Sequence, residues 1–287
     1  MRRKARGRRR AIPSGPELFY PAGVPRLLLF GPGYTASRIA SALEGEGWEV
    51  ARIGRAEIGD RVAVAGAIAA ASHILSSVPP AERDDPVLAL HREALAAAPA
   101  GWIGYLSSTG VYGDTGGAWV DESAPTGQGR RGARAAADRA WQGLHPAVRV
   151  FRLPGIYGPG RSALDRVAAG AGRRLALPAQ VFSRVHVDDI VAGVIASLRR
   201  GPPGLYNLAD DRPSSQNAVI EYACDLAGIA WPPLTALADA GLSPQARAFY
   251  TENRRVANGR AKRLLGWVPR YPDYRAGLTA LHRDSTR

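Results

Sequence analysis

The strongest constraint on the fold is a regular alternation of short apolar runs with helical segments, which begins at residue 26. The apolar runs are continuous rather than alternating, as is typical of strands that are buried on both faces of a parallel sheet. We therefore predict an α/β fold of the Rossmann type, with a doubly wound parallel sheet and right-handed crossovers. The expected strands are 26–30, 48–53, 73–78, 102–108, 148–153 and 204–209.

Amphipathic stretches separate these runs and predict the helices of the fold. The second half of the chain is less regular, and its final segment, 259–278, reads as two short helices around a Pro-rich turn. We expect a basic arm at 1–24, a nucleotide-binding domain at 25–175, and a smaller, interleaved substrate lobe at 176–287. The expected helices lie near 35–44, 61–71, 86–98, 131–144, 187–199 and 214–228.

The formal net charge of +13 is concentrated at the N-terminus. The first ten residues, MRRKARGRRR, carry seven positive charges, which leaves +6 on the other 277 residues. This arm has no interleaved aromatic residues and forms no recognised nucleic-acid module, so we expect no specific nucleic-acid partner.

The lengths of the apolar runs and the single cysteine indicate the cellular compartment and the absence of a metal site. No apolar run approaches the 18 residues of a membrane span, and the N-terminus lacks the apolar region of a secretory signal. A lone Cys224 in an amphipathic stretch suits a buried thiol in a reducing compartment, and no histidine pair has the spacing of metal ligands. We therefore expect a cytoplasmic protein without a metal.

The first expected strand runs into FGPGYTASRIA, which fits the Gly-x-Gly-x-x-Gly/Ala pattern of dinucleotide-binding loops. Gly31 permits the tight turn, Gly33 lets the backbone approach a pyrophosphate, and Ala36 allows close packing of helix on strand. The helix that follows directs its free N–H groups at the phosphates. The loop therefore predicts a bound dinucleotide, with Tyr34 beside it.

The end of the second expected strand distinguishes NADP from NAD. NAD-binding proteins place a carboxylate there, whereas this chain offers Arg52 and Arg55, with Glu57 slightly farther on. Arginine suits bidentate binding of a phosphate. We therefore expect NADP rather than NAD, while Glu57 keeps contact with a ribose open.

Five further motifs follow the glycine loop in a fixed order. The series resembles the short-chain dehydrogenase/reductase superfamily, in particular its extended branch of nucleotide-sugar epimerases and dehydratases and the atypical members of that branch. The resemblance covers nearly all of the chain after residue 25. The motifs are LSSTGVYGD at 106–114, DESAPT at 121–126, RLPGIYGPGR at 152–161, RVHVDDI at 184–190 and YNLADDRPSS at 206–215.

The resemblance implies roles for residues of these motifs. Ser108 would hydrogen-bond the substrate oxygen at the carbon where hydride moves, and Pro154 and Ile156 would flank the nicotinamide. At His186, Asp188 and Asp189 we favour a helix cap and loop brace over a catalytic role. The remaining implied contacts are Ser77 and Ser107 to the cofactor, and Tyr112, Arg161 and Arg184 to the substrate.

The chain departs from the family at its Tyr-x-x-x-Lys pair. Alignment on the flanking acidic residues puts Arg130 at the tyrosine, Arg134 at the lysine, and Asp138 four residues later. Arg134 can still bind ribose hydroxyls, but Arg130 cannot transfer a proton, because its guanidinium stays protonated. Possible substitute proton donors are Tyr34, Tyr112, Asp114 and Tyr157.

Thr109 and Gly110 occupy the positions where related dehydratases carry an Asp-Glu pair, so sugar dehydration is not expected. We expect an NADP-dependent oxidoreductase or epimerase that acts on a sugar nucleotide or a small carbonyl or hydroxyl compound. The alternative is a catalytically degenerate protein that holds NADP(H) for redox sensing or scaffolding. The resemblance also implies a homodimer through the helices at 86–98 and 131–144.

Overall fold

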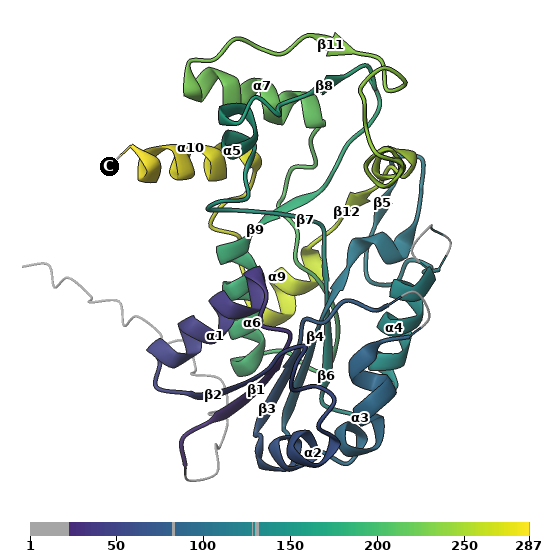
Figure 1. Cartoon of the computed structure of the whole chain (residues 1–287), viewed down its shortest axis with the longest axis vertical. Helices are drawn as coiled ribbons and strands as arrows, with labels where there is room; N and C mark the ends of the chain where they lie inside the picture. The colour runs from purple at the N-terminus through teal and green to yellow at the C-terminus, as the bar shows by residue number, and fades with distance from the viewer. Residues whose placement is uncertain (1–22, 82–83, 128, 130–131, 287) are drawn as a thin grey trace, which may run out of the picture.

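The core of the molecule is a six-stranded parallel sheet with the order β2-β1-β3-β4-β6-β10 (Figure 1). The computed structural model describes residues 23–81, 84–127, 129 and 132–286. Most of the predicted arm at 1–24, and Arg130, lie outside these ranges. The predicted Rossmann-type fold is confirmed. The strands are β1 (Arg26–Phe30), β2 (Glu49–Ile53), β3 (His73–Ser76), β4 (Trp102–Ser108), β6 (Val148–Leu153) and β10 (Gly204–Asn207).

Helices cover both faces of the sheet because its strands are apolar on both sides. Leu27 and Leu29 of β1 belong to one core, whereas Leu28 and Phe30 belong to the other. Helices α1 (Tyr34–Gly45), α6 (Val187–Arg199) and α9 (Gly259–Leu265) contribute to the first core. Helices α2 (Arg61–Ala70), α3 (Pro86–Ala96) and α4 (Gly132–Gln142) contribute to the second.

A smaller lobe lies at one end of the sheet, at the top of Figure 1. Helices α5 (Ala163–Ala168), α7 (Gln216–Ala227) and α10 (Tyr274–Ser285) pack there around Val167, Ile220 and Leu278. Cys224 is buried in the same cluster. The shorter elements are β5 (Trp119–Val120), β7 (Gly155–Tyr157), β8 (Arg174–Leu175), β9 (Arg184–His186), β11 (Leu234–Thr235), β12 (Arg255–Val256), α8 (Pro244–Arg247), η1 (Thr109–Tyr112) and η2 (Ala248–Thr251).

The chain passes between the sheet and the lobe more than once. Helix α5 belongs to the lobe although it precedes the predicted boundary at 175, and α6 and β10 belong to the sheet although they follow it. The apolar run at 204–207 pairs with β6 and completes the sheet, which places it away from the lobe. In the part of the chain that the structure describes, no helix is long and apolar enough to cross a membrane.

Candidate active site

A cavity of about 910 Å³ lies where the carboxyl ends of the strands meet the lobe. Ligands of open α/β sheets bind at this edge. The described residues contain no group of three or more His, Cys, Asp or Glu side chains that could hold a metal ion. The cavity wall includes Tyr34, Thr35 and Ser77 near the nucleotide loop, then Ser107, Ser108, Arg134, Pro154 and Ile156, and finally Arg161, Arg166, Arg184, Gln216 and Tyr250 toward the lobe.

The glycine loop is shaped for close approach of a phosphate. Gly31 has φ +75°, and a Cβ there would lie 2.9 Å from Val78 Cγ2. A Cβ at Gly33, the N-cap of α1, would meet only the Gly31 carbonyl oxygen, at 4.0 Å, and no side chain caps this helix. Ala36 is fully buried against the sheet. The loop and the uncapped N–H groups therefore fit the pyrophosphate of a dinucleotide.

The two arginines at the end of β2 differ in their surroundings. Arg52 is paired with Glu44 of α1, with 2.8 Å between Nη2 and Oε2. The Glu57 carboxylate accepts a hydrogen bond from the Gly54 backbone N–H at 2.8 Å. Arg55 is exposed and makes no hydrogen bond or ion pair with any described residue. Of these three side chains, Arg55 has its charge available for a phosphate.

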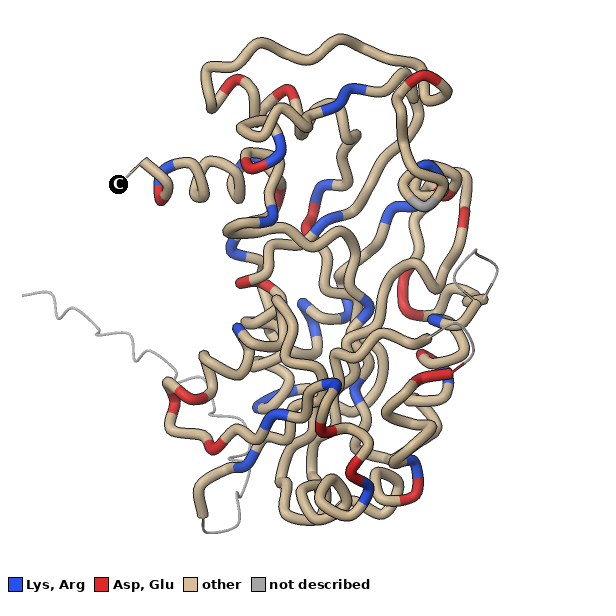
Figure 2. The backbone as a smooth tube through the Cα atoms, viewed as in Figure 1, with Lys and Arg blue, Asp and Glu red and all other residues tan. Residues whose placement is uncertain are grey.

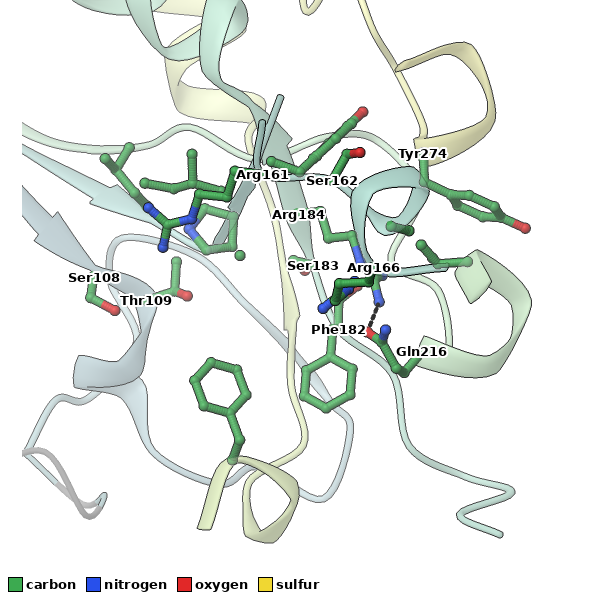
Figure 3. Close-up of a pocket in the computed structure, with 18 of the residues that line it drawn as sticks. Ser108, Thr109, Arg161, Ser162, Arg166, Phe182, Ser183, Arg184, Gln216 and Tyr274 are labelled. Atoms are coloured by element: carbon green, nitrogen blue, oxygen red, sulfur yellow. Dashed lines mark hydrogen bonds between the residues drawn. The ribbon is translucent and has the colours of Figure 1, made fainter. Parts of the chain in front are cut away.

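Ser108, at the end of β4, lines the cavity (Figure 3). Its Oγ accepts a hydrogen bond from the Gly110 N–H at 3.1 Å and keeps its own hydrogen to donate. Arg134 reaches the same cavity from α4 and is not hydrogen-bonded or ion-paired to the described residues. The structure therefore brings Ser108 and Arg134 to one cavity, whereas Arg130 lies outside the described residues.

A buried polar network lies behind this wall and was not predicted. Ser107 donates to Asp138 at 2.6 Å, and Arg152 donates to the same carboxylate through Nε at 3.1 Å and Nη2 at 2.7 Å. Arg152 Nη1 also donates to the Tyr112 hydroxyl at 3.0 Å, which donates to Asn207 Oδ1 at 2.7 Å. The hydroxyl groups of Ser107 and Tyr112 are thus engaged within the protein.

Tyr112 is not among the residues that line the cavity. The structure places it in the core, where burial raises the pKa of its hydroxyl to about 12. One signal for the network was present in the sequence, because Arg152 lies in β6 among the buried apolar residues Val150, Phe151 and Leu153. A buried guanidinium needs hydrogen-bond acceptors around it, but the sequence alone does not identify which side chain supplies them.

The other proposed proton donors are also engaged. The Tyr34 hydroxyl donates to the Pro159 carbonyl at 3.0 Å, and the Tyr157 hydroxyl donates to the Asp273 carbonyl at 3.4 Å. Burial raises the pKa of both tyrosines, which makes them poorer acids. Asp114 does not line the cavity and accepts a hydrogen bond from the Asn253 N–H at 2.8 Å. None of these three groups is poised to deliver a proton at Ser108.

Basic residues occur along the segments between the sheet and the lobe (Figure 2). Arg161 is exposed, and its guanidinium lies 5.6 Å from the centre of the Tyr34 ring. Arg184 is buried and donates through Nη1 to the carbonyls of Phe182 and Ser214, both at 2.9 Å. Burial lowers the pKa of Arg184 to about 10. Both predicted substrate-side arginines therefore line the cavity, in contrast to Tyr112.

The residues at the start of α6 cap this helix and attach it to a neighbouring segment. His186 is the N-cap, and its Nδ1 accepts from the Asp188 N–H at 3.2 Å. The Asp189 carboxylate accepts from the backbone N–H groups of Arg270 at 2.6 Å and Tyr271 at 3.1 Å. These contacts tie α6 to the segment before α10.

No family model matches the chain, but known proteins are similar to it. A conserved protein of unknown function from Silicibacter pomeroyi is 41% identical, and the match covers 91% of this chain and 99% of that one with a TM-score of 0.82. A 3-diazoavenalumate denitrifying reductase from a Streptomyces species is 35% identical over 143 residues. That match covers 45% of this chain and 45% of the reductase, so the chain matches less than half of the reductase's length.

More distant solved structures share the fold. A dTDP-glucose 4,6-dehydratase from Streptomyces venezuelae with NAD bound is 18% identical, with a TM-score of 0.73 over 90% of this chain and 96% of that one. A human epimerase family protein with NADPH is 16% identical, with a TM-score of 0.69 over 90% and 99%. Solved structures with this fold therefore include one with NAD bound and one with NADPH.

Proposed function

The chain belongs to the same family as the conserved protein from Silicibacter pomeroyi, and from this premise we propose that it is an NADP-dependent reductase with the extended short-chain dehydrogenase/reductase fold. The observation that carries the proposal is that one cavity extends from the glycine loop past the end of β4 to the lobe. Tyr34 beside the glycine loop, Ser108 at the end of β4 and Arg184 of the lobe all line it. A cofactor on the loop and a substrate in the lobe would therefore meet at Ser108.

The residues of the sheet edge fit the parts of the cofactor. The glycine loop would hold the pyrophosphate, Arg55 the 2′-phosphate, and Arg134 the ribose hydroxyls. Pro154 and Ile156 also line the cavity and would flank the nicotinamide. When bound, NADPH supplies a hydride to the carbon of the substrate.

Reduction suits this site better than epimerisation. Epimerisation through a hydroxyl group needs one residue that removes a proton and returns it, and Tyr34 and Tyr157 are engaged with carbonyl groups. Hydride reduction of a diazonium carbon needs no protein acid: a C–H bond forms, the C–N bond breaks, and its electron pair leaves with N₂. The name of the Streptomyces relative describes a reductase of a diazo compound. Ser108 would orient the reacting group through its hydroxyl.

The decisive experiment combines cofactor titration with turnover. The purified protein is titrated with NADPH and NADH, and nicotinamide absorbance is then followed with small carbonyl compounds, sugar nucleotides and arenediazonium carboxylates. We expect tighter binding of NADPH and oxidation of NADPH with an arenediazonium or a carbonyl compound, beyond the rate without protein. Failure to bind either nucleotide would refute the proposal.

A second candidate is a protein that holds NADP(H) without turnover. It is favoured by the engaged hydroxyls of Tyr34 and Tyr157, which are not poised to deliver a proton at Ser108. Tight NADPH binding without oxidation across the whole panel would support it over the reductase. The homodimer through α3 and α4 stays a prediction, and light scattering after size-exclusion chromatography tests it.

A further inference from the structure

The lobe end of the cavity carries an arginine that no carboxylate neutralises. Arg166 of α5 lines the cavity, and its guanidinium forms no hydrogen bond or ion pair with any described residue. The carboxylate of the preceding residue, Asp165, accepts from the Ser162 backbone N–H and hydroxyl, both at 2.6 Å. The surrounding protein lowers the pKa of Arg166. The Arg166 side chain is solvent-exposed, so its N–H donors can reach an anion in the cavity.

Arg184 fixes a second positive charge close to Arg166 (Figure 3). Its three hydrogen bonds, to the carbonyls of Phe182 and Ser214 and to Gln216 Oε1 at 3.2 Å, hold the guanidinium in one orientation. No carboxylate of the described residues forms an ion pair with it. Arg184 therefore contributes a positive field, while Arg166 has donors left for direct contact.

Aromatic side chains form the wall beside these arginines. The rings of Phe182 and Phe249 lie 6.2 Å apart between centroids, and the Tyr250 ring is perpendicular to Phe182 at 5.8 Å. Phe249 lines the cavity and is 48% exposed. A planar ring in the cavity would cover this exposed aromatic surface.

Of the cavity arginines without an ion pair to the described residues, Arg134 extends from α4 and Arg161 lies over the Tyr34 ring, while Arg166 comes from α5 in the lobe. Of the other lobe-side arginines, Arg254 is paired with Glu252 at 3.0 Å, and its Nη1 donates to the Gly113 carbonyl. The planar fork of Arg166 matches one carboxylate.

We propose that this end of the cavity is a binding subsite for the carboxylate of a singly charged aromatic acid, with Arg166 as the recognising residue and the Phe182–Phe249–Tyr250 wall as the ring platform. The subsite rests on the proposed function in one respect, since the acid would be the substrate reduced at Ser108. It departs from a sugar-nucleotide substrate, which carries a diphosphate.

Calorimetry with simple probes tests the subsite. Cinnamate, its neutral isostere cinnamamide, acetate and UDP are each titrated into the protein, with and without saturating NADP⁺. We expect cinnamate to bind at least about tenfold more tightly than each of the other three, since a charged hydrogen-bonded pair contributes about 1.5–3 kcal/mol. Arg166→Met should remove this preference, and Arg166→Lys should keep part of it, since the charge stays and the fork is lost.

Arg212→Met is the matched control, because Arg212 is exposed, lies outside the cavity wall and makes no side-chain contact with the described residues. It should bind cinnamate as the unaltered protein does. Equal affinity for cinnamate and cinnamamide, tighter binding of UDP, or no change in Arg166→Met would each overturn the subsite. Arg166-dependent cinnamate binding by a protein that binds no nicotinamide nucleotide would sustain the subsite while the reductase proposal fails.

Discussion

Arg152 and Asp138 form a two-point ion pair inside the protein, with side-chain exposures of 2% and 0%. The pair joins β6 to α4, and α4 also carries Arg134 into the cavity. Because the same carboxylate accepts from Ser107, it fixes the end of β4 as well. One buried carboxylate thus holds three elements of the candidate site in register.

Removing this charge should destabilise the fold strongly. We expect Asp138→Asn to lower the free energy of unfolding by about 3–5 kcal/mol, because Arg152 is left as an unpaired buried cation. Denaturant titration measures the change. Glu49→Gln breaks the surface pair with Arg26, whose side chains are more than half exposed, and should cost no more than about 1 kcal/mol. Similar losses in the two variants would contradict the role of burial.

Arg55 should distinguish the two nicotinamide cofactors. Arg55→Ala should weaken NADPH binding by about 10- to 100-fold through loss of a charged hydrogen bond to the 2′-phosphate, and leave NADH binding nearly unchanged. Fluorescence titration with both nucleotides provides the measurement. Arg92→Ala, an exposed substitution on α3, serves as the control. Equal losses for the two nucleotides would refute the assignment of Arg55.

Ser108 should matter for turnover and not for cofactor binding. Ser108→Ala should lower kcat by about 100-fold or more, the effect seen when a donor to the reacting group is removed. The dissociation constant for NADPH should stay within about twofold, a change below 0.5 kcal/mol. Ser285→Ala, near the end of α10, is the matched control. Unchanged turnover in Ser108→Ala would remove this hydroxyl from the mechanism.

Tyr112→Phe separates a core role from a substrate contact. The substitution leaves Asn207 and Arg152 each without one partner, so we expect a loss of about 1–3 kcal/mol in unfolding free energy. The KM of any accepted substrate should not change. A large rise in KM at unchanged stability would restore the substrate contact that the sequence suggested.

His73 should make the free energy of unfolding depend on pH between about 6.5 and 4. Burial lowers the pKa of His73 to about 4 from 6.5, so the folded state keeps it neutral where the unfolded chain binds a proton. Unfolding free energy should therefore fall as the pH drops from 6.5 toward 4, by up to about 1.4 kcal/mol per unit for one such site. Denaturation across this range should show a smaller slope in His73→Phe than in His282→Gln. Equal slopes would contradict the assignment.

The fold was predictable because its strands coincide with contiguous apolar runs in the sequence. The strands predicted at 26–30 and 102–108 have the same bounds as β1 and β4 in the structure. The strands predicted at 73–78 and 204–209 end two residues earlier in the structure, at Ser76 and Asn207, and Ser77 lines the cavity. Strand ends depend on tertiary contacts that local composition does not encode.

The site was predictable where a motif is contiguous and not where partners are distant. The glycine loop and Ser108 lie in short motifs, and the structure places both at the carboxyl edge of the sheet. By contrast, Tyr112 meets Asn207 across 95 residues, and Ser107 meets Asp138 across 31. Arg166 lies in a helix of ordinary composition, and its significance comes from the cavity around it.

The interleaving of sheet and lobe restricts how this architecture can be recombined. The lobe helix α5 precedes the last sheet strand, β10, and the lobe helix α7 follows it. A single genetic crossover at any point between α5 and α7 would therefore transfer part of the lobe together with part of the sheet. Because no single contiguous segment encodes the lobe, its substrate range would change through substitutions within the lobe or through exchange of several separate segments.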